Sequence, residues 1–175
     1  MTNPRIWTAP AVDRGGFPVG EGERESLELF LDYHRATLLT KCAGLTGEQL
    51  ARRAVPPSGL SLLGLVRHMA EVEMWWFRLK FGRNEDLPLL FCGDVRDGDF
   101  DLVDPARAEE DYATFVREVG LARETAAGRS LDEYFPGLKR PLTLRWLYLH
   151  MIQEYARHNG HADLLREAID GVTGD

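Results

Sequence analysis

The side chains best suited to metal binding or proton transfer gather near the C-terminus, in the segment LHMIQEYARHNGHADLL, residues 149–165. On a helix at about 100° per residue, His150, Glu154, His158 and His161 fall in one sector at the edge of the apolar face. Imidazole and carboxylate are ligands that divalent transition metals favour, and a histidine can also accept or relay a proton near neutral pH. This segment is therefore the first candidate for a functional site.

A row of polar groups at an apolar face needs partners, since burying a polar group without one costs roughly 1–3 kcal/mol. Glu154 and His158 are four residues apart, so both side chains can reach one ion from the same helix face. His68, flanked by apolar residues in its own predicted helix, is the candidate third ligand. Three protein ligands with an open position are typical of a catalytic metal site. A hydrogen-bonded polar stripe, with His68 and His34 as core or supporting histidines, remains the other interpretation.

Four helical patterns must position these groups. Their apolar residues recur at helical spacing, and none of the segments shows the alternation of a half-buried strand. A short capped turn, Thr46–Leu50, lies between the first two patterns. The fold class is therefore all-α, a four-helix bundle with a long crossover connection. We expect an irregular N-terminal arm over 1–22 and the bundle domain over 23–175, with helices at about 23–42, 61–81, 104–128 and 143–168.

The crossover is the acidic segment 82–105, and a connection this long inside a domain is unusual. Its central acidic residues are Asp94, Asp97, Asp99 and Asp101. They do not form an EF-hand, because Pro105 stands where that loop needs its last glutamate. We interpret these aspartates as part of a solvated acidic loop.

Composition excludes several classes of protein. The chain has 175 residues, of which 44% are hydrophobic, and a formal net charge of −7, which argues against nucleic-acid and anionic-membrane partners. No apolar run is long enough to cross a membrane, and the start MTNPRIWTAP has no apolar signal core. Cys42 and Cys92 are too few for a disulfide scaffold and fit a reducing compartment. We expect a cytoplasmic protein.

Two stretches resemble a known family. LSLLGLVRHMAEVEMWWF (60–77) and LYLHMIQEYARHNGHADLLREAIDG (147–171) are similar to the second and last helices of the DinB-like metalloprotein superfamily. Within it, they resemble the mycothiol-dependent branch of maleylpyruvate isomerase and S-transferases. The resemblance extends over roughly residues 23–171 and implies one divalent metal ion, zinc or nickel, held by His68, Glu154 and His158. Many members carry a histidine where this chain has Glu154.

The resemblance also implies an activity. It implies that the chain, like members of the superfamily, adds or transfers a low-molecular-weight thiol such as mycothiol to an electrophilic small molecule, through a metal-bound thiolate. His161 or His150 could then take the thiol proton, and Trp75 and Trp76 could wall the pocket. Relatives also suggest a homodimer. Two alternatives stay open: a hydrolase with metal-bound water, and a non-catalytic metal-binding stress or sensor protein.

Overall fold

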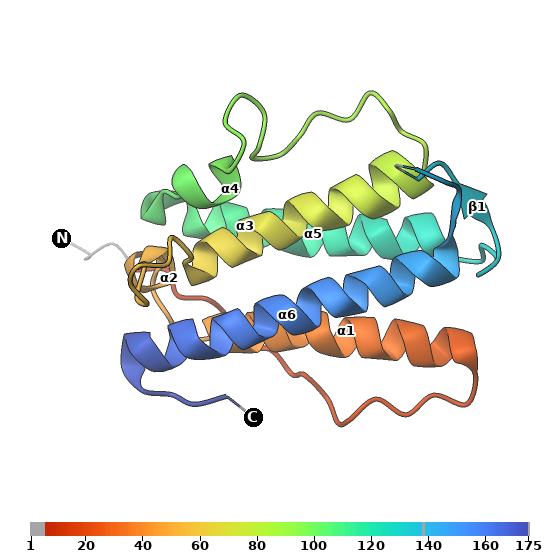
Figure 1. The fold of residues 1–175 in the computed structure, drawn as a ribbon. Coiled ribbons are helices and arrows are strands. Elements are labelled where there is room, and N and C mark those ends of the chain that lie inside the picture. Colours follow the sequence, from red (N-terminus) through yellow and green to blue (C-terminus); the bar gives the residue numbers. More distant parts are fainter. Residues whose placement is uncertain (1–5, 138, 175) are drawn as a thin grey trace.

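Four long helices run side by side along one axis in the computed structural model, which describes residues 6–137 and 139–174 (Figure 1). Helix α1 packs chiefly against α6, and α3 packs chiefly against α5. The predicted all-α class is thereby confirmed. The long helices are α1 (Glu23–Cys42), α3 (Leu62–Glu73) with its π-helical continuation η1 (Met74–Phe81), α5 (Ala108–Ala126) and α6 (Leu144–Asp170).

The helix ends follow local signals in the sequence. Thr46 and Gln49 form a reciprocal capping box at the start of α2 (Gly47–Ala51). Thr143 caps α6 by accepting a hydrogen bond from the backbone N–H of Trp146 at 3.2 Å. The helix continues to Asp170, two residues beyond the predicted end, and stops at Gly171, whose φ of 79° is left-handed.

A small hairpin closes one end of the bundle. Strands β1 (Tyr134–Phe135) and β2 (Leu142–Thr143) pair antiparallel, with Tyr134 opposite Thr143. The buried ring of Phe135 packs edge-on against Phe81 at the end of η1, with 5.6 Å between the ring centroids. The sequence pattern does not reveal this hairpin, because two residues per strand are too few to show alternation.

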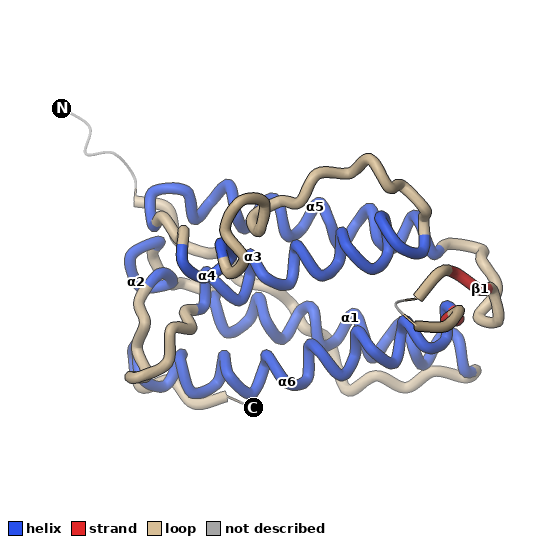
Figure 2. Tube along the Cα trace, turned by 45° about the horizontal axis from the view of Figure 1, so that its top comes forward, coloured by secondary structure: helices blue, strands red, loops and turns tan. Residues whose placement is uncertain are grey.

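The crossover returns along the bundle from the end of η1 to the short helix α4 (Gly98–Asp101), and then enters α5 through the 3₁₀ turn η2 (Pro105–Arg107) (Figure 1 and Figure 2). Buried Arg67 of α3 holds α4 in place. Its guanidinium donates to the backbone oxygens of Gly98 and Asp99 at 3.0 and 2.9 Å, and to the carboxylate of Asp111 in α5 at 2.9 Å. This segment of the crossover is therefore bonded to the bundle.

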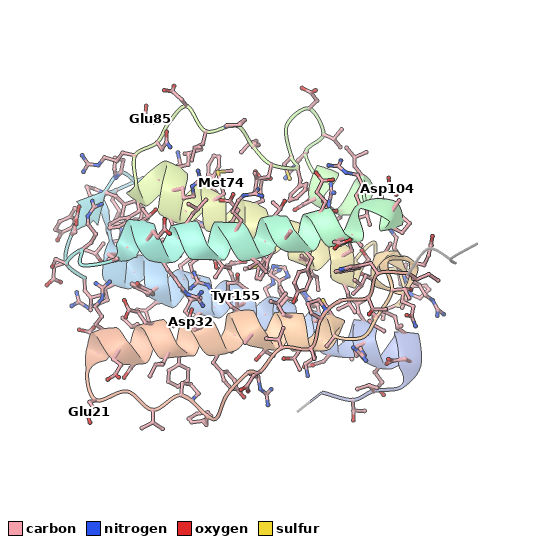
Figure 3. All side chains as sticks on the ribbon, turned by 180° about the vertical axis from the view of Figure 1, so that it is seen from behind. Glu21, Asp32, Met74, Glu85, Asp104 and Tyr155 are labelled. Atoms are coloured by element: carbon pink, nitrogen blue, oxygen red, sulfur yellow. The ribbon has the colours of Figure 1, made fainter. Side chains whose placement is uncertain are left out.

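The bundle interior contains a buried charged network. Arg35 of α1 donates two hydrogen bonds of 2.7 Å to the carboxylate of Glu73, which is 0% exposed. The hydroxyl of Tyr155, which lies in the interior between α1 and α5 in Figure 3, donates to the same carboxylate at 2.7 Å. A fully desolvated carboxylate is stable only with such partners, so this network fixes the packing of α1, α3 and α6.

The described part of the N-terminal arm, residues 6–22, contains no helix and lies along the bundle. The backbone of Ala9 donates to Leu45 at 2.9 Å, and Trp7 packs edge-on against Tyr112 of α5. Among the described helices, none combines the length and apolar character needed to cross a membrane.

Candidate metal centre

Side chains from α3 and α6 meet between the two helices. His68, Glu154 and His158 each offer one ligand atom, and these atoms lie within 4.8 Å of one another. The imidazole centroids of His68 and His158 are 4.8 Å apart, and Nε2 of His158 is 3.6 Å from the carboxylate of Glu154. The structure therefore brings together the three side chains that the sequence analysis selected.

His158 is buried, and its environment favours the neutral imidazole. Loss of hydration lowers the pKa of His158 to about 4, and the neighbouring His68, His161 and Arg157 act in the same direction. A histidine must be neutral to bind a metal ion. His158 is thus already in the form that a metal ligand requires at neutral pH.

The orientation of His68 is set by a residue from the crossover. The carboxylate of Asp99 lies 2.7 Å from Nδ1 of His68, and Asp99 is only 4% exposed. Because a carboxylate is an acceptor, Nδ1 carries the proton and Nε2 keeps its lone pair. Carboxylates commonly orient metal-binding histidines in this way. Our interpretation of Asp99 as part of a solvated loop is wrong, since α4 folds this residue into the bundle.

Phe100 packs on the other side of the same imidazole. Its ring centroid is 5.3 Å from that of His68. This approach depends on Gly64, one turn earlier in α3, because a Cβ there would lie 2.7 Å from Cδ1 of Phe100. The glycine in LSLLGLVRH thus leaves the space in which α4 can cover His68.

The two candidate catalytic histidines occupy different places. Nδ1 of His161 lies 3.4 Å from Nδ1 of His158, so His161 contacts a candidate ligand. His150 instead lies against two indoles, with its centroid 4.7 Å from Trp76 and 4.8 Å from Trp146. Burial lowers the pKa of His150, which keeps it neutral. His150 therefore lies one helical turn before Glu154, among the tryptophans at one end of the bundle.

A cavity of about 360 Å³ opens beside His68, between α3, η1 and the crossover. Trp75 and Trp76 line it, as the sequence analysis expected of a pocket wall. Glu71 lines it too, and its carboxylate accepts hydrogen bonds from the backbone N–H groups of residues 90 and 91 at 3.2 and 2.7 Å. Glu71 thereby fixes the crossover over this cavity. It was not among the candidate residues from the sequence.

The remaining histidine and the two cysteines lie outside the ligand cluster. The backbone oxygen of His34 accepts a hydrogen bond from Asn159 at 3.0 Å, which places His34 beside α6 in a supporting position. Cys42 is buried in the core, and burial raises its pKa to about 12. Cys92 is half-buried at the cavity, and burial raises its pKa as well. Neither thiol has the lowered pKa of a reactive cysteine.

The donor set suits a divalent metal ion. Two imidazoles and one carboxylate are a typical three-ligand set of catalytic zinc sites, with ligand distances of about 2.0–2.2 Å. The ligand atoms already converge within 4.8 Å, and one imidazole has its outer nitrogen bonded to a carboxylate. The residues present therefore fit a divalent metal ion.

Comparison with known proteins identifies a matching family. A family model described as Mycothiol-S-transferase matches residues 26–171, which includes every long helix from the first turn of α1 to the end of α6. No curated protein and no solved structure matches the chain.

Proposed function

The chain belongs to the mycothiol-S-transferase family, which is DinB-like, and from this premise we propose that it joins a low-molecular-weight thiol such as mycothiol to an electrophilic small molecule. The convergence of His68, Glu154 and His158 beside a cavity of about 360 Å³ carries this proposal. A divalent ion bound there, zinc or nickel, favours the thiolate over the thiol and so supplies a nucleophile at neutral pH.

The side chains around the site then have distinct tasks. Asp99 holds His68 in the tautomer whose Nε2 faces its ligand position, and Phe100 fixes the plane of the ring. Trp75 and Trp76 exclude water from one side of the cavity. His161, in contact with His158, is our candidate to accept the proton that the thiol loses when it becomes a thiolate.

The proposal is tested with purified full-length protein, mycothiol and chlorodinitrobenzene, in which the sulfur displaces chloride. We expect conjugation above the uncatalysed rate with zinc or nickel, loss of this activity with a chelator, and its return when metal is added. His68→Ala should abolish metal binding and conjugation together. His34→Ala is the matched control, because it removes an imidazole that supplies no ligand atom to the cluster.

Two results would replace this proposal by another function. Turnover of an ester or amide that needs metal but no thiol would assign a hydrolase with activated water. Stoichiometric metal with no turnover, and a melting temperature that collapses on chelation, would assign a structural or sensing role to the metal.

A further inference from the structure

A second cavity, of about 250 Å³, is lined by residues of η1, the start of α6 and the β1–β2 hairpin. Figure 1 shows these three elements at one end of the bundle. The cavity is lined by Trp76, Lys139, Arg140, Leu142 and Trp146. Two indoles and a leucine form an apolar interior, while the two cations come from the hairpin loop. No part of the function proposed above uses these hairpin residues.

The aromatic walls of this cavity are fixed by mutual packing. Trp76 and Trp146 lie 5.4 Å apart at an interplanar angle of 58°. His150 stacks on Trp146 at 11° and meets Trp76 at 69°. Rings held by neighbours lose little conformational entropy when a ligand binds, which favours the binding of a flat apolar group.

The two hairpin-loop cations have no partner in the part of the chain that the structure describes. Among the described residues, the side chains of Lys139 and Arg140 make no ion pair and no hydrogen bond, and both are exposed. Arg145, a short distance along the chain, instead pairs with both Glu23 and Asp132. A protein with a net charge of −7 has many acidic groups available, so two adjacent unpaired cations beside an apolar cavity favour an anion.

Trp76 connects this cavity to the candidate metal centre, because it lines both cavities. It lies eight residues after His68, and Trp146 lies eight residues before Glu154 in the helix that runs the opposite way. At about 1.5 Å per residue, the backbone positions of both tryptophans are about 12 Å along the bundle axis from those of the ligands. One small molecule can span this distance.

We propose that Trp76, Trp146, Lys139 and Arg140 form a subsite for a flat apolar group that carries an anionic substituent such as a carboxylate. The subsite holds the end of the electrophile that is remote from the reacting carbon. This inference rests on the proposed transferase function for the identity of its occupant, whereas the binding itself can be measured without turnover.

The test uses a matched pair of probes, naphthoate and naphthamide, which share the ring and differ in charge. Their affinities for the full-length protein are measured by calorimetry, with metal present and again with a chelator, because a carboxylate could also bind the metal ion. We expect naphthoate to bind more tightly in both conditions. Arg140→Gln should weaken the binding of naphthoate by roughly three- to tenfold and leave the affinity for naphthamide unchanged.

Two further variants separate the parts of the subsite. Trp146→Leu should lower the affinity for both probes, since it removes an aromatic wall of the cavity. Arg52→Gln is the matched control, because Arg52 is an exposed arginine with no side-chain ion pair to residues 6–137 or 139–174, and it lies beside α2 rather than the hairpin. Equal binding of the two probes, no binding of either, or an Arg140→Gln protein whose preference for naphthoate is undiminished would each overturn the subsite.

Conjugation kinetics then separate this inference from the proposed function. Chloronitrobenzoate should have a lower KM than chloronitrobenzamide, and Arg140→Gln should reduce this difference in KM. If the protein conjugates neither compound yet prefers naphthoate, the transferase proposal fails and the subsite stands. If it conjugates both compounds equally and shows no preference for naphthoate, the subsite proposal fails and the transferase proposal stands.

Discussion

The carboxylate of Asp99 accepts a hydrogen bond from Nδ1 of His68 at 2.7 Å, although 31 positions of the chain separate the two residues. This bond joins the crossover to the long helix that supplies a candidate metal ligand. It also makes the geometry of the ligand depend on how the crossover folds. The first two predictions follow from this connection.

Asp99→Asn should weaken zinc binding by about 10- to 100-fold, because an amide can present its N–H₂ group to Nδ1 and no longer fixes the tautomer. Affinity is measured by competition with a chromogenic chelator. Asp94→Asn, at an exposed aspartate of the same crossover, is the control and should bind zinc as the unmodified protein does. Equal affinities of the two variants would show that Asp99 has no orienting role.

Gly64→Ala should destabilise the fold by about 1–3 kcal/mol, since the new Cβ would lie 2.7 Å from the ring of Phe100. Gly120→Ala in α5 is the contrasting variant, because nothing lies within 4 Å of its Cβ position. It should stabilise the helix by about 0.5–1 kcal/mol. Urea denaturation measures both, and a neutral Gly64→Ala would mean that α4 moves freely away from His68.

Replacement of Glu154, the carboxylate of the candidate ligand cluster, tests the ligand set directly. Glu154→Ala should reduce metal affinity by at least about 100-fold, more than the loss of an outer partner such as Asp99. Glu154→His should retain a metal ion, since an imidazole four residues before His158 reaches the same position. Elemental analysis of the purified variants gives the stoichiometry. Full occupancy in Glu154→Ala would remove this residue from the ligand set.

Glu73→Ala should destabilise the protein by about 3–5 kcal/mol, because it removes the buried carboxylate that Arg35 and Tyr155 share and leaves Arg35 only its pair with Asp32. Glu110→Ala removes one partner of an exposed pair with Arg107 and should leave the free energy of unfolding nearly unchanged. Thermal or urea unfolding distinguishes the two. Comparable effects of the two substitutions would contradict the structural importance of the buried pair.

The two thiols should differ in their reaction with an aromatic disulfide reagent. Burial raises the pKa of Cys42 to about 12, so its thiolate is scarce below pH 9 and its sulfur is inaccessible. Only Cys92 should react in the native protein, with a rate that still rises above pH 8 because burial raises its pKa too. Cys92→Ser should therefore abolish native labelling, while both thiols of the unmodified protein react in denaturant. Rapid labelling of Cys42 would show that the bundle opens.

Much of the bundle was predictable because its signals are local. The capping box of Thr46 and Gln49, the cap at Thr143 and the left-handed stop at Gly171 each depend on a few neighbouring residues. The spacing that places Glu154 and His158 on one face is likewise a property of a single helix. The homodimer, by contrast, stays a prediction from resemblance.

The sequence by itself determined the four long helices and which side chains each presents, because helical periodicity and capping act within a few turns. Only the tertiary structure decided that Asp99 leaves the acidic loop to bind His68, and that Trp76 meets Trp146. The same holds for the pairing of Arg35 with Glu73. These contacts join segments far apart in the chain, and their free energy depends on burial and packing that no local pattern encodes.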